Sequence, residues 1–355
     1  MSSDNFLKLR DKLQATYGDS SVMLVSDIPV RPPLPSASLA LDFALGGGLP
    51  PDRVVEVAGS EGTGKSSLGL LAMANFLDLQ PDRGAVILDL EHKLTASWVE
   101  QLIGKERMSR VILAWPDHME EATDIYTKAV STGEISFVLV DSIGGAPTQR
   151  VTEKSAEKGN IGGNALAVTR FAQLASIYSQ KYHCLTFGVN QTREDMGGYN
   201  RHVTPGGRAW KHACVIRIQL KRGQGKIEEK VNNESMQIGY EVVAKVIKNQ
   251  LAAQGRTASY WFFNVDTDGK WPFGIDRLEE IVRIGLLVGV IRQGGAMYYH
   301  DALPNGGVKS KDTLTQYVRE HPDFYQLLSQ QVLGLLKENG EMANMVAPIE
   351  AVEEE

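Results

Sequence analysis

Residues 53–66 read RVVEVAGSEGTGKS, and this stretch decides the fold. Residues 59–66 match the phosphate-loop pattern G-x-x-x-x-G-K-[ST] in full. The glycines let successive backbone N–H groups turn toward a polyphosphate, while Lys65 brings a charge to the terminal phosphates and the Ser66 hydroxyl can bind Mg²⁺. A β-branched run precedes the loop, and residues 67–76 have helical spacing. This strand–loop–helix order places phosphates at a helix N-terminus, so the sequence predicts a nucleoside triphosphate site.

The composition limits the class of protein. The chain has 355 residues, of which 43% are apolar and 23% charged, which predicts two domains or one large domain with appendages. No run has the length of a membrane span and the N-terminus lacks a signal-peptide stretch, so we expect a cytoplasmic protein without membrane contact. Cys184 and Cys214 lie in strand-like runs and are expected to be buried free thiols. The net charge of −6 still allows a local basic patch for nucleic acid.

The first 36 residues form a separate segment in the sequence pattern. Residues 6–17 have helical spacing, residues 21–25 (SVMLV) resemble a short strand, and residues 28–36 carry four prolines. The proline-rich stretch is typical of an extended linker. A small helix and strand cannot bury much surface alone, so we expect this segment to dock on its own chain or on a neighbouring copy.

Strands and helices alternate from residue 37 to about 270, which predicts an α/β core around a mainly parallel sheet. The last strands follow one another with little helix between them, which indicates an antiparallel edge. The predicted strands are 54–58, 85–89, 111–114, 137–141, 184–190, 215–220, 240–248 and 259–265.

The composition changes after Trp271. A helix near 277–287, a strand near 297–299 and an amphipathic helix near 323–337 predict a small α+β domain over 271–345. Residues 346–355 form an acidic tail. This tail is either a solubilising end or a competitor for a basic groove elsewhere.

Polar residues stand at the carboxyl ends of the predicted strands, the edge at which open parallel sheets bind ligands. Asp141 ends a Walker B strand (FVLVD), and with Ser66 it can supply the oxygen ligands that Mg²⁺ prefers. Glu91 follows the next strand end and can position water for attack on a γ-phosphate. Gln191 carries a neutral amide that can sense that phosphate. With Asn190, which precedes Gln191 at the end of the same strand, four such groups stand beside the phosphate loop and predict an ATP-hydrolysing site.

Two glycine-containing loops follow these strand ends. Residues 192–210 contain arginines, an aromatic residue and four glycines, and residues 144–163 contain Arg150. Arginines with an interleaved aromatic suit phosphate contacts and base stacking. Their position after the Mg²⁺ aspartate and the phosphate-sensing glutamine predicts a nucleic-acid surface controlled by nucleotide.

With these motifs in order, the chain resembles the RecA recombinases of bacteria and their phage relatives. The resemblance covers residues 5–340 and is carried by PSASLALDFALGGGLP, VVEVAGSEGTGKSSL, ILDLEHKLTASWVEQLIG, FVLVDSIGG, VNQTR and VAKVIKNQLAA. It implies a catalytic role for Glu91, and it implies that Trp98 stacks on adenine. It also implies that the N-terminal helix and strand pack on the adjacent subunit, and that Lys248 reaches across to the neighbour's phosphates. Gln250 stands where the family has a second lysine.

The resemblance, together with the motifs, assigns three groups of site residues. The expected catalytic residues are Lys65, Glu91, Gln191 and Lys248. The nucleotide-binding residues are Gly59, Ser60, Glu61, Gly62, Thr63, Gly64, Lys65, Ser66, Ser67 and Trp98, with Ser66 and Asp141 as Mg²⁺ ligands. The DNA-binding residues are Arg150, Ile161, Gly162, Arg193, Tyr199, Arg201, Gly206, Gly207 and Arg208.

The expected fold is thus a RecA-type P-loop ATPase core with an N-terminal polymerisation element and a small C-terminal domain. The expected activity is that of an ATP- and Mg²⁺-dependent recombinase. It would form helical filaments on single-stranded DNA and exchange strands with double-stranded DNA. ATP would lie between protomers, with Lys248 and the strand end at 221–222 facing it from the next subunit. Two alternatives share these motifs, a hexameric helicase of the same core fold and a non-catalytic recombination mediator.

Overall fold

The computed structural model describes residues 3–18, 21–145, 161–194, 202–231, 234–265 and 273–338. The chain divides into two compact units, Met1–Pro32 and Pro33–Glu355. The domain boundaries expected near residues 270 and 345 stay predictions.

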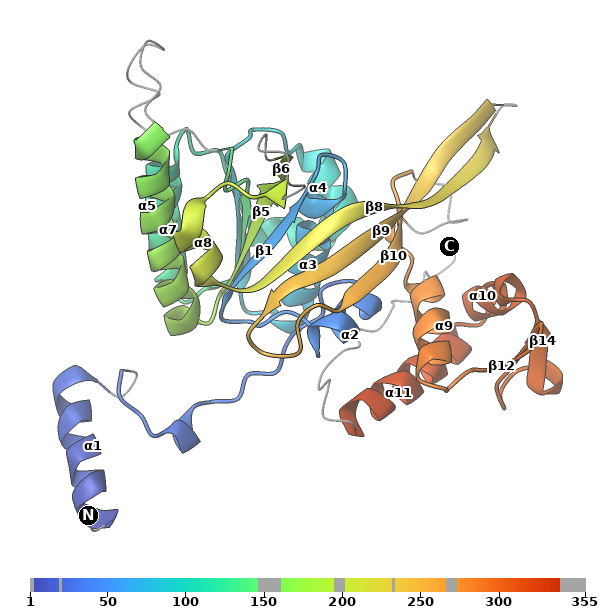
Figure 1. The fold of residues 1–355 in the computed structure, drawn as a ribbon, viewed down its shortest axis with the longest axis horizontal. Coiled ribbons are helices and arrows are strands. Elements are labelled where there is room, and N and C mark those ends of the chain that lie inside the picture. Colours follow the sequence, from blue (N-terminus) through green and yellow to red (C-terminus); the bar gives the residue numbers. More distant parts are fainter. Residues whose placement is uncertain are drawn as a thin grey trace. The chain divides into compact units, whose positions relative to one another are not determined.

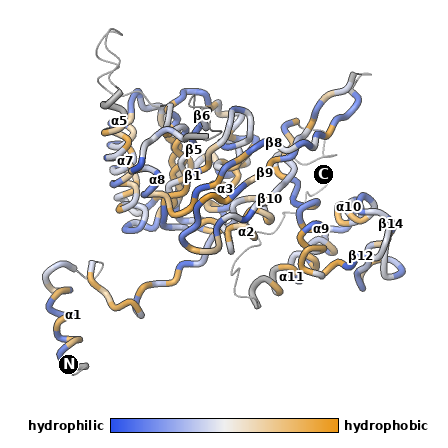
Figure 2. Tube along the Cα trace, viewed as in Figure 1, coloured by the Kyte–Doolittle hydropathy of each residue, from blue (hydrophilic) through white to orange (hydrophobic). Residues whose placement is uncertain are grey.

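The N-terminal unit consists of helix α1 (Ser3–Tyr17) and a short 3₁₀ helix, η1 (Val25–Asp27). The strand predicted over 21–25 is wrong. An isolated extended segment has no neighbouring strand in this unit to satisfy its backbone groups, and the Val22 amide instead donates to the Gly18 carbonyl. Hydrophobic residues recur along α1 (Figure 2), yet several of its apolar side chains are exposed, among them Phe6, Leu9 and Tyr17.

A nine-stranded sheet organises the second unit (Figure 1), in the order β11-β10-β9-β8-β1-β5-β4-β2-β3. Neighbouring strands from β3 to β8 run parallel, and β9, β10 and β11 add antiparallel pairs, so the mainly parallel sheet with an antiparallel edge is confirmed. The strands are β1 (Val54–Gly59), β2 (Gly84–Asp89), β3 (Val111–Ala114), β4 (Ile135–Asp141), β5 (Leu185–Gln191), β8 (Cys214–Val231), β9 (Glu234–Asn249), β10 (Thr257–Phe263) and β11 (Gly274–Ile275). A separate ribbon pairs β6 (Arg193–Glu194) with β7 (His202–Val203).

Strand register brings the polar strand ends together. Asp89 on β2 pairs with Asp141 on β4, and Gly59 on β1 pairs with Gln191 on β5. Because the strands are parallel, all of these residues lie at one edge of the sheet.

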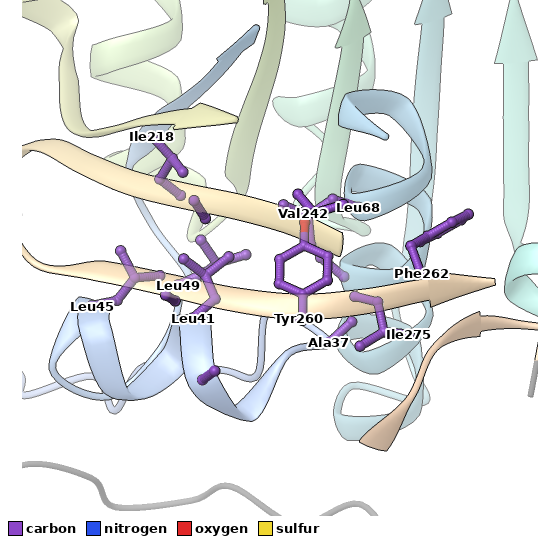
Figure 3. Close-up of a cluster of buried hydrophobic side chains, with 14 of the residues drawn as sticks. Ala37, Leu41, Leu45, Leu49, Leu68, Ile218, Val242, Tyr260, Phe262 and Ile275 are labelled. Atoms are coloured by element: carbon purple, nitrogen blue, oxygen red, sulfur yellow. The ribbon is translucent and has the colours of Figure 1, made fainter. Parts of the chain in front are cut away.

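Helices cover both faces of the sheet, as parallel strands buried on both sides require. They are α2 (Leu39–Leu45), α3 (Lys65–Leu79), α4 (Ala96–Ile103), η2 (Lys105–Arg110), α5 (Met119–Val130), α7 (Ile161–Tyr182) and α8 (Gly207–Ala213). One core packs α2, α3 and α4 against residues such as Val55 and Val57. Part of it is drawn in Figure 3, where Leu41 and Leu45 of α2 lie beside strands that carry Ile218 and Tyr260. The opposite core packs α5, α7 and α8.

In the described residues after β11, the chain forms three α-helices, one 3₁₀ helix and a small antiparallel sheet. The elements are α9 (Arg277–Leu287), β12 (Arg292–Gly294), β13 (Met297–Tyr299), η3 (Pro304–Gly306), β14 (Gly307–Lys309), α10 (Lys311–Glu320) and α11 (Pro322–Glu338). The helices predicted over 277–287 and 323–337 and the strand predicted near 297–299 are confirmed. Ile281, Leu314 and Leu328 bury these helices in the same core as α2.

Two further expectations concern cysteines and membranes. Cys184 and Cys214 are buried and free, as predicted. Within the described residues, no helix combines the length and apolar character that a membrane crossing needs.

The buried carboxyl group of Glu280 joins α9 to the start of α2. It accepts hydrogen bonds from the Ser38 hydroxyl at 2.5 Å and from the backbone N–H of Leu39 at 3.1 Å. Burial raises the pKa of Glu280 to about 7, although these hydrogen bonds and the charge of Arg283 act in the opposite direction. Folded Glu280 therefore keeps a proton that the unfolded chain releases above a pKa of 4.5.

Stability should consequently fall as pH rises from about 4.5 to about 7, by up to about 3 kcal/mol from this group. Glu280→Gln cannot ionise, so the unfolding free energy of the wild type should drop relative to that of the variant between pH 5 and pH 8. Urea denaturation at both pH values measures the difference. The exposed Glu320→Gln is the control and should show no such change; an equal difference for Glu280→Gln at both pH values would contradict the assignment.

Candidate functional site

The phosphate loop connects β1 to α3. Gly59 is buried, and a Cβ added there would lie 2.6 Å from the Leu220 carbonyl oxygen, so only glycine fits. Gly62 and Gly64 have φ values of 70° and 82°, a left-handed conformation that glycine adopts without strain. Lys65 Nζ donates to the Ser60 carbonyl at 2.7 Å. The loop therefore supplies a hydrogen-bond acceptor for its own lysine and keeps a shape that can surround a phosphate.

The loop opens into a cavity of about 520 Å³, a volume typical of small-molecule sites. The structure brings the predicted polar residues together around it. The cavity is lined from the loop by Lys65 and Ser66 and from the strand ends by Glu91, Asp141 and Gln191.

Glu91 is the centre of a hydrogen-bond network in this cavity. Its Oε1 accepts from Ser142 Oγ at 2.5 Å and from Gln191 Nε2 at 3.3 Å, and its Oε2 is 2.7 Å from Lys93 Nζ. Burial acts to raise the pKa of Glu91, but the hydrogen bonds and charge of Lys93 outweigh it and the pKa is lowered. Glu91 is therefore held as a carboxylate, the form that a general base needs. Ser142 and Lys93 were not identified from the sequence, although each lies within two residues of a predicted residue.

Lys65 has a lowered pKa because burial disfavours its charge, and the charges of Asp141 and Glu91 only partly offset that effect. A terminal phosphate would add the anion that this buried ammonium lacks.

Ser66 and Asp141 fit a magnesium ion. Ser66 Oγ donates to Asp141 Oδ2, and burial raises the pKa of Asp141 to about 6. Among the described residues, no cluster of three or more His, Cys, Asp or Glu side chains could hold a metal. One hydroxyl and one carboxylate match Mg²⁺, which usually keeps several waters and shares its ligands with phosphate oxygens.

The lining of the cavity includes aromatic side chains. Trp98 is half-buried, and its ring meets Phe273 edge to face with centroids 5.7 Å apart. Tyr240, Phe262 and Asn264 also line the cavity. An aromatic and amide lining suits a nucleobase, whose faces stack and whose edges form hydrogen bonds.

Arg222 lies on the phosphate loop of its own chain and lines the cavity there. Its Nε donates to the Gly62 carbonyl at 3.0 Å, and its guanidinium lies 3.9 Å from the centroid of the Tyr240 ring. The cause is the parallel pairing of β8 with β1, which places Leu220 beside Gly59. Contact of the strand end at 221–222 with a neighbour's nucleotide stays a prediction.

Lys248 does not line the cavity of its own chain. Its Nζ donates to the carbonyls of Lys211 at 3.0 Å and Cys214 at 2.5 Å, at the C-terminal end of α8. Burial lowers the pKa of this lysine. Its action on the nucleotide of a neighbouring copy stays a prediction.

The predicted DNA-binding residues are only partly described. Arg150, Tyr199 and Arg201 lie outside the described residues. Ile161 and Gly162 begin α7, and Arg193 belongs to β6. Gly206 and Gly207 have φ values of 96° and 69° at the start of α8, where Arg208 is exposed. Their roles stay predictions.

A phosphate loop that lies beside polar strand ends, at one edge of a parallel sheet, defines a P-loop nucleotide-binding protein. The family model described as the RecA N-terminal domain matches residues 7–264, well over half of the chain. The chain therefore belongs to the RecA family of recombinases.

Individual relatives cover nearly the whole chain. "Protein RecA" of Streptococcus pyogenes serotype M28 (strain MGAS6180) is 28% identical over 326 residues, which span 90% of this chain and 82% of the relative. "Protein RecA" of Cytophaga hutchinsonii is also 28% identical, over 343 residues, 95% of this chain and 92% of the relative. A solved structure described as the crystal structure of the RadB recombinase is 20% identical with a TM-score of 0.49, and the match covers 64% of this chain and 94% of that one.

The Lys93–Glu91 contact generates a test of the site. Lys93→Met should raise the pKa of Glu91, because it removes a hydrogen bond and a positive charge that stabilise the carboxylate. The acid limb of kcat for ATP hydrolysis should move to higher pH. Lys93→Arg keeps the charge and should leave the limb near its original position. An acid limb that is the same in all three proteins would show that Glu91 does not set it.

Proposed function

We propose that this protein is a DNA-dependent ATPase that polymerises on single-stranded DNA and promotes homologous pairing and strand exchange. The observation that carries the proposal is the hydrogen bond between Gln191 and Glu91. It joins the residue that opens the second glycine-rich loop to the residue best placed to activate water. Membership of the RecA family supports the same activity.

ATP binds with its phosphates in the loop and its base against Trp98, which lines the cavity. Lys65 exchanges the Ser60 carbonyl for the terminal phosphates, while Arg222 and Tyr240 hold the loop from the side of β8 and β9. Ser66 and Asp141 would hold Mg²⁺, and the bound ion would neutralise phosphate charge.

Hydrolysis needs a water in line with the γ-phosphate. Glu91 accepts a proton from that water, and Ser142 and Lys93 fix the orientation of its carboxylate. Gln191 turns its amide from Glu91 to a γ-phosphate oxygen, so the start of the second loop follows the nucleotide. Loss of the γ-phosphate reverses this change.

The two loops bind the DNA backbone through their arginines, on single-stranded DNA first and then on the incoming duplex. Affinity depends strongly on salt because cations that neutralise phosphates release counterions. The described arginines of this set are Arg193 in β6 and the exposed Arg208 at the start of α8.

Polymerisation uses the exposed apolar side chains of the N-terminal unit. Val25 and Val30 are 85% and 95% exposed, which is unusual for such residues unless a partner covers them. Edge strand β3 carries Ile112, and Trp115 follows it; both are 57% exposed. An unpaired edge with apolar side chains accepts an added strand. Such head-to-tail contacts build a filament, or a ring if the rotation closes.

Glu91→Gln tests the chemistry. The amide keeps the shape but cannot accept the proton, so turnover of ATP should fall at least about 100-fold with little change in nucleotide affinity. Hydrolysis assays with and without single-stranded DNA, followed by a strand-exchange assay, measure this. A variant that turns over at the wild-type rate would count against the assignment, and an unaltered wild-type rate on adding DNA would contradict DNA dependence.

Leu9→Asp in α1 tests polymerisation. A charge on this apolar surface should prevent docking, so filaments on single-stranded DNA with a non-hydrolysable ATP analogue should disappear. Electron microscopy and light scattering detect the change. Lys12→Asp, on the same helix, is the control and should leave filaments intact. Discrete rings formed by the wild type would favour a hexameric helicase instead.

A further inference from the structure

A buried polar cluster lies behind the nucleotide cavity. Glu56, in the middle of β1, has a side chain that is 0% exposed. Its Oε1 accepts from Asn190 Nδ2 at 2.8 Å and from Trp210 Nε1 at 3.0 Å, and its Oε2 accepts from Arg217 Nε at 2.5 Å. We call Glu56, Asn190, Trp210 and Arg217 the Glu56 cluster. Its members come from β1, β5, α8 and β8, so one carboxylate ties four segments together.

Asn190 connects this cluster to the phosphate-sensing residue. Its Oδ1 accepts from the backbone N–H of Gln191 at 3.0 Å, while its Nδ2 also donates to the Pro205 carbonyl at 2.9 Å. The same amide therefore holds Gln191, which leads into the second loop, and Pro205 near the loop's other end.

A second bond holds the same returning segment. Arg217 Nη2 donates to Thr204 Oγ1 at 3.1 Å, in addition to its ion pair with Glu56. Thr204 and Pro205 are thus attached to the Glu56 cluster by two independent side chains.

Close packing removes free space around these bonds. A Cβ on Gly188 would lie 2.3 Å from the Trp210 ring, and one on Gly206 would lie 3.2 Å from Trp210 Cβ. A Cβ on Gly144, at the start of the first loop, would lie 2.6 Å from Pro205 and 2.9 Å from Asn190 Oδ1. The ends of both loops are therefore packed closely against Asn190 and Pro205. Because the packing leaves no free space, a small displacement of one of these residues displaces its neighbours.

We propose that the Glu56 cluster is a relay that converts movement of Gln191 at the γ-phosphate into displacement of the returning end of the second loop, residues 204–206. The inference rests on the proposed function. None of the four residues lines the nucleotide cavity, so they act as positioning residues rather than catalytic ones. A buried polar group loses free energy when it is left unpaired. Asn190 therefore cannot follow Gln191 without taking the Pro205 carbonyl with it.

Two variants weaken the relay while preserving most of the packing. Trp210→Phe removes the indole donor to Glu56, and Thr204→Val replaces the hydroxyl that accepts from Arg217 by a methyl group of similar size. Thr204→Ser restores that hydroxyl. Tyr126→Phe is the matched control, because it removes a buried hydroxyl that bonds to Thr186 in the same core without touching the Glu56 cluster.

The measured quantity is the ratio of single-stranded DNA affinity with a non-hydrolysable ATP analogue to that with ADP. In Trp210→Phe and Thr204→Val this ratio should fall about tenfold or more, while affinity for the ATP analogue stays within about twofold. Thr204→Ser and Tyr126→Phe should keep the wild-type ratio. Circular dichroism and thermal melting establish that each variant is folded. A wild-type ratio in folded Trp210→Phe and Thr204→Val would overturn the relay.

Hydrogen exchange separates failure of the relay from failure of the proposed function. Adding the ATP analogue without DNA should change the exchange of backbone amides over 202–210 in the wild type, and this change should be lost in Trp210→Phe. If the wild type shows the exchange change but no nucleotide-dependent DNA binding, the proposed function fails and the relay stands. If wild-type exchange at 202–210 does not respond to nucleotide, the relay is wrong whatever the protein does with DNA.

Discussion

The pairing of β1 between β5 and β8 is the constraint on which the rest of this structure depends. Both neighbours run parallel to β1, and their register places Gln191 and Leu220 on either side of Gly59. The phosphate loop thus leaves the sheet with the sensing glutamine beside it. Arg222, two residues after Leu220, reaches back over the loop to the Gly62 carbonyl. A one-residue slip of either neighbour would turn these side chains to the opposite face.

Much of the fold follows from local sequence. The strands β1, β2, β4 and β5 are mostly apolar, which is the pattern of buried parallel strands, and their ends carry the polar site residues. The hairpin of β8 and β9 extends beyond the predicted strands. Its outer part, with Lys226 and Glu228, lacks an apolar run because it is solvated rather than packed. Residues 21–25 show the opposite case, an apolar run that does not form a strand. An apolar run becomes a strand only where a partner strand is available.

The functional site likewise contains some residues that the sequence predicts and others that it does not. Lys65, Ser66, Glu91, Asp141 and Gln191 could be predicted because motif and strand end coincide. Tyr240 and the placement of Arg222 could not, since they depend on which strands pair across long stretches of chain. The partners of Glu56 are hidden for the same reason: a single glutamate inside an apolar strand gives no sign of which donors will meet it. The action of Lys248 on a neighbour depends on how two copies of the chain assemble, which local sequence does not encode.

The Glu56 cluster also has an evolutionary consequence. Its carboxylate meets an amide, an indole and a guanidinium from three other segments, and replacing any one residue leaves a buried group unmatched. The four residues are therefore not expected to change independently of one another during evolution. A substitution at one of these positions should be accompanied by substitutions at the others. Related sequences should therefore show correlated changes between the middle of β1 and the start of β8, and these changes should accompany changes in the loop between β5 and α8.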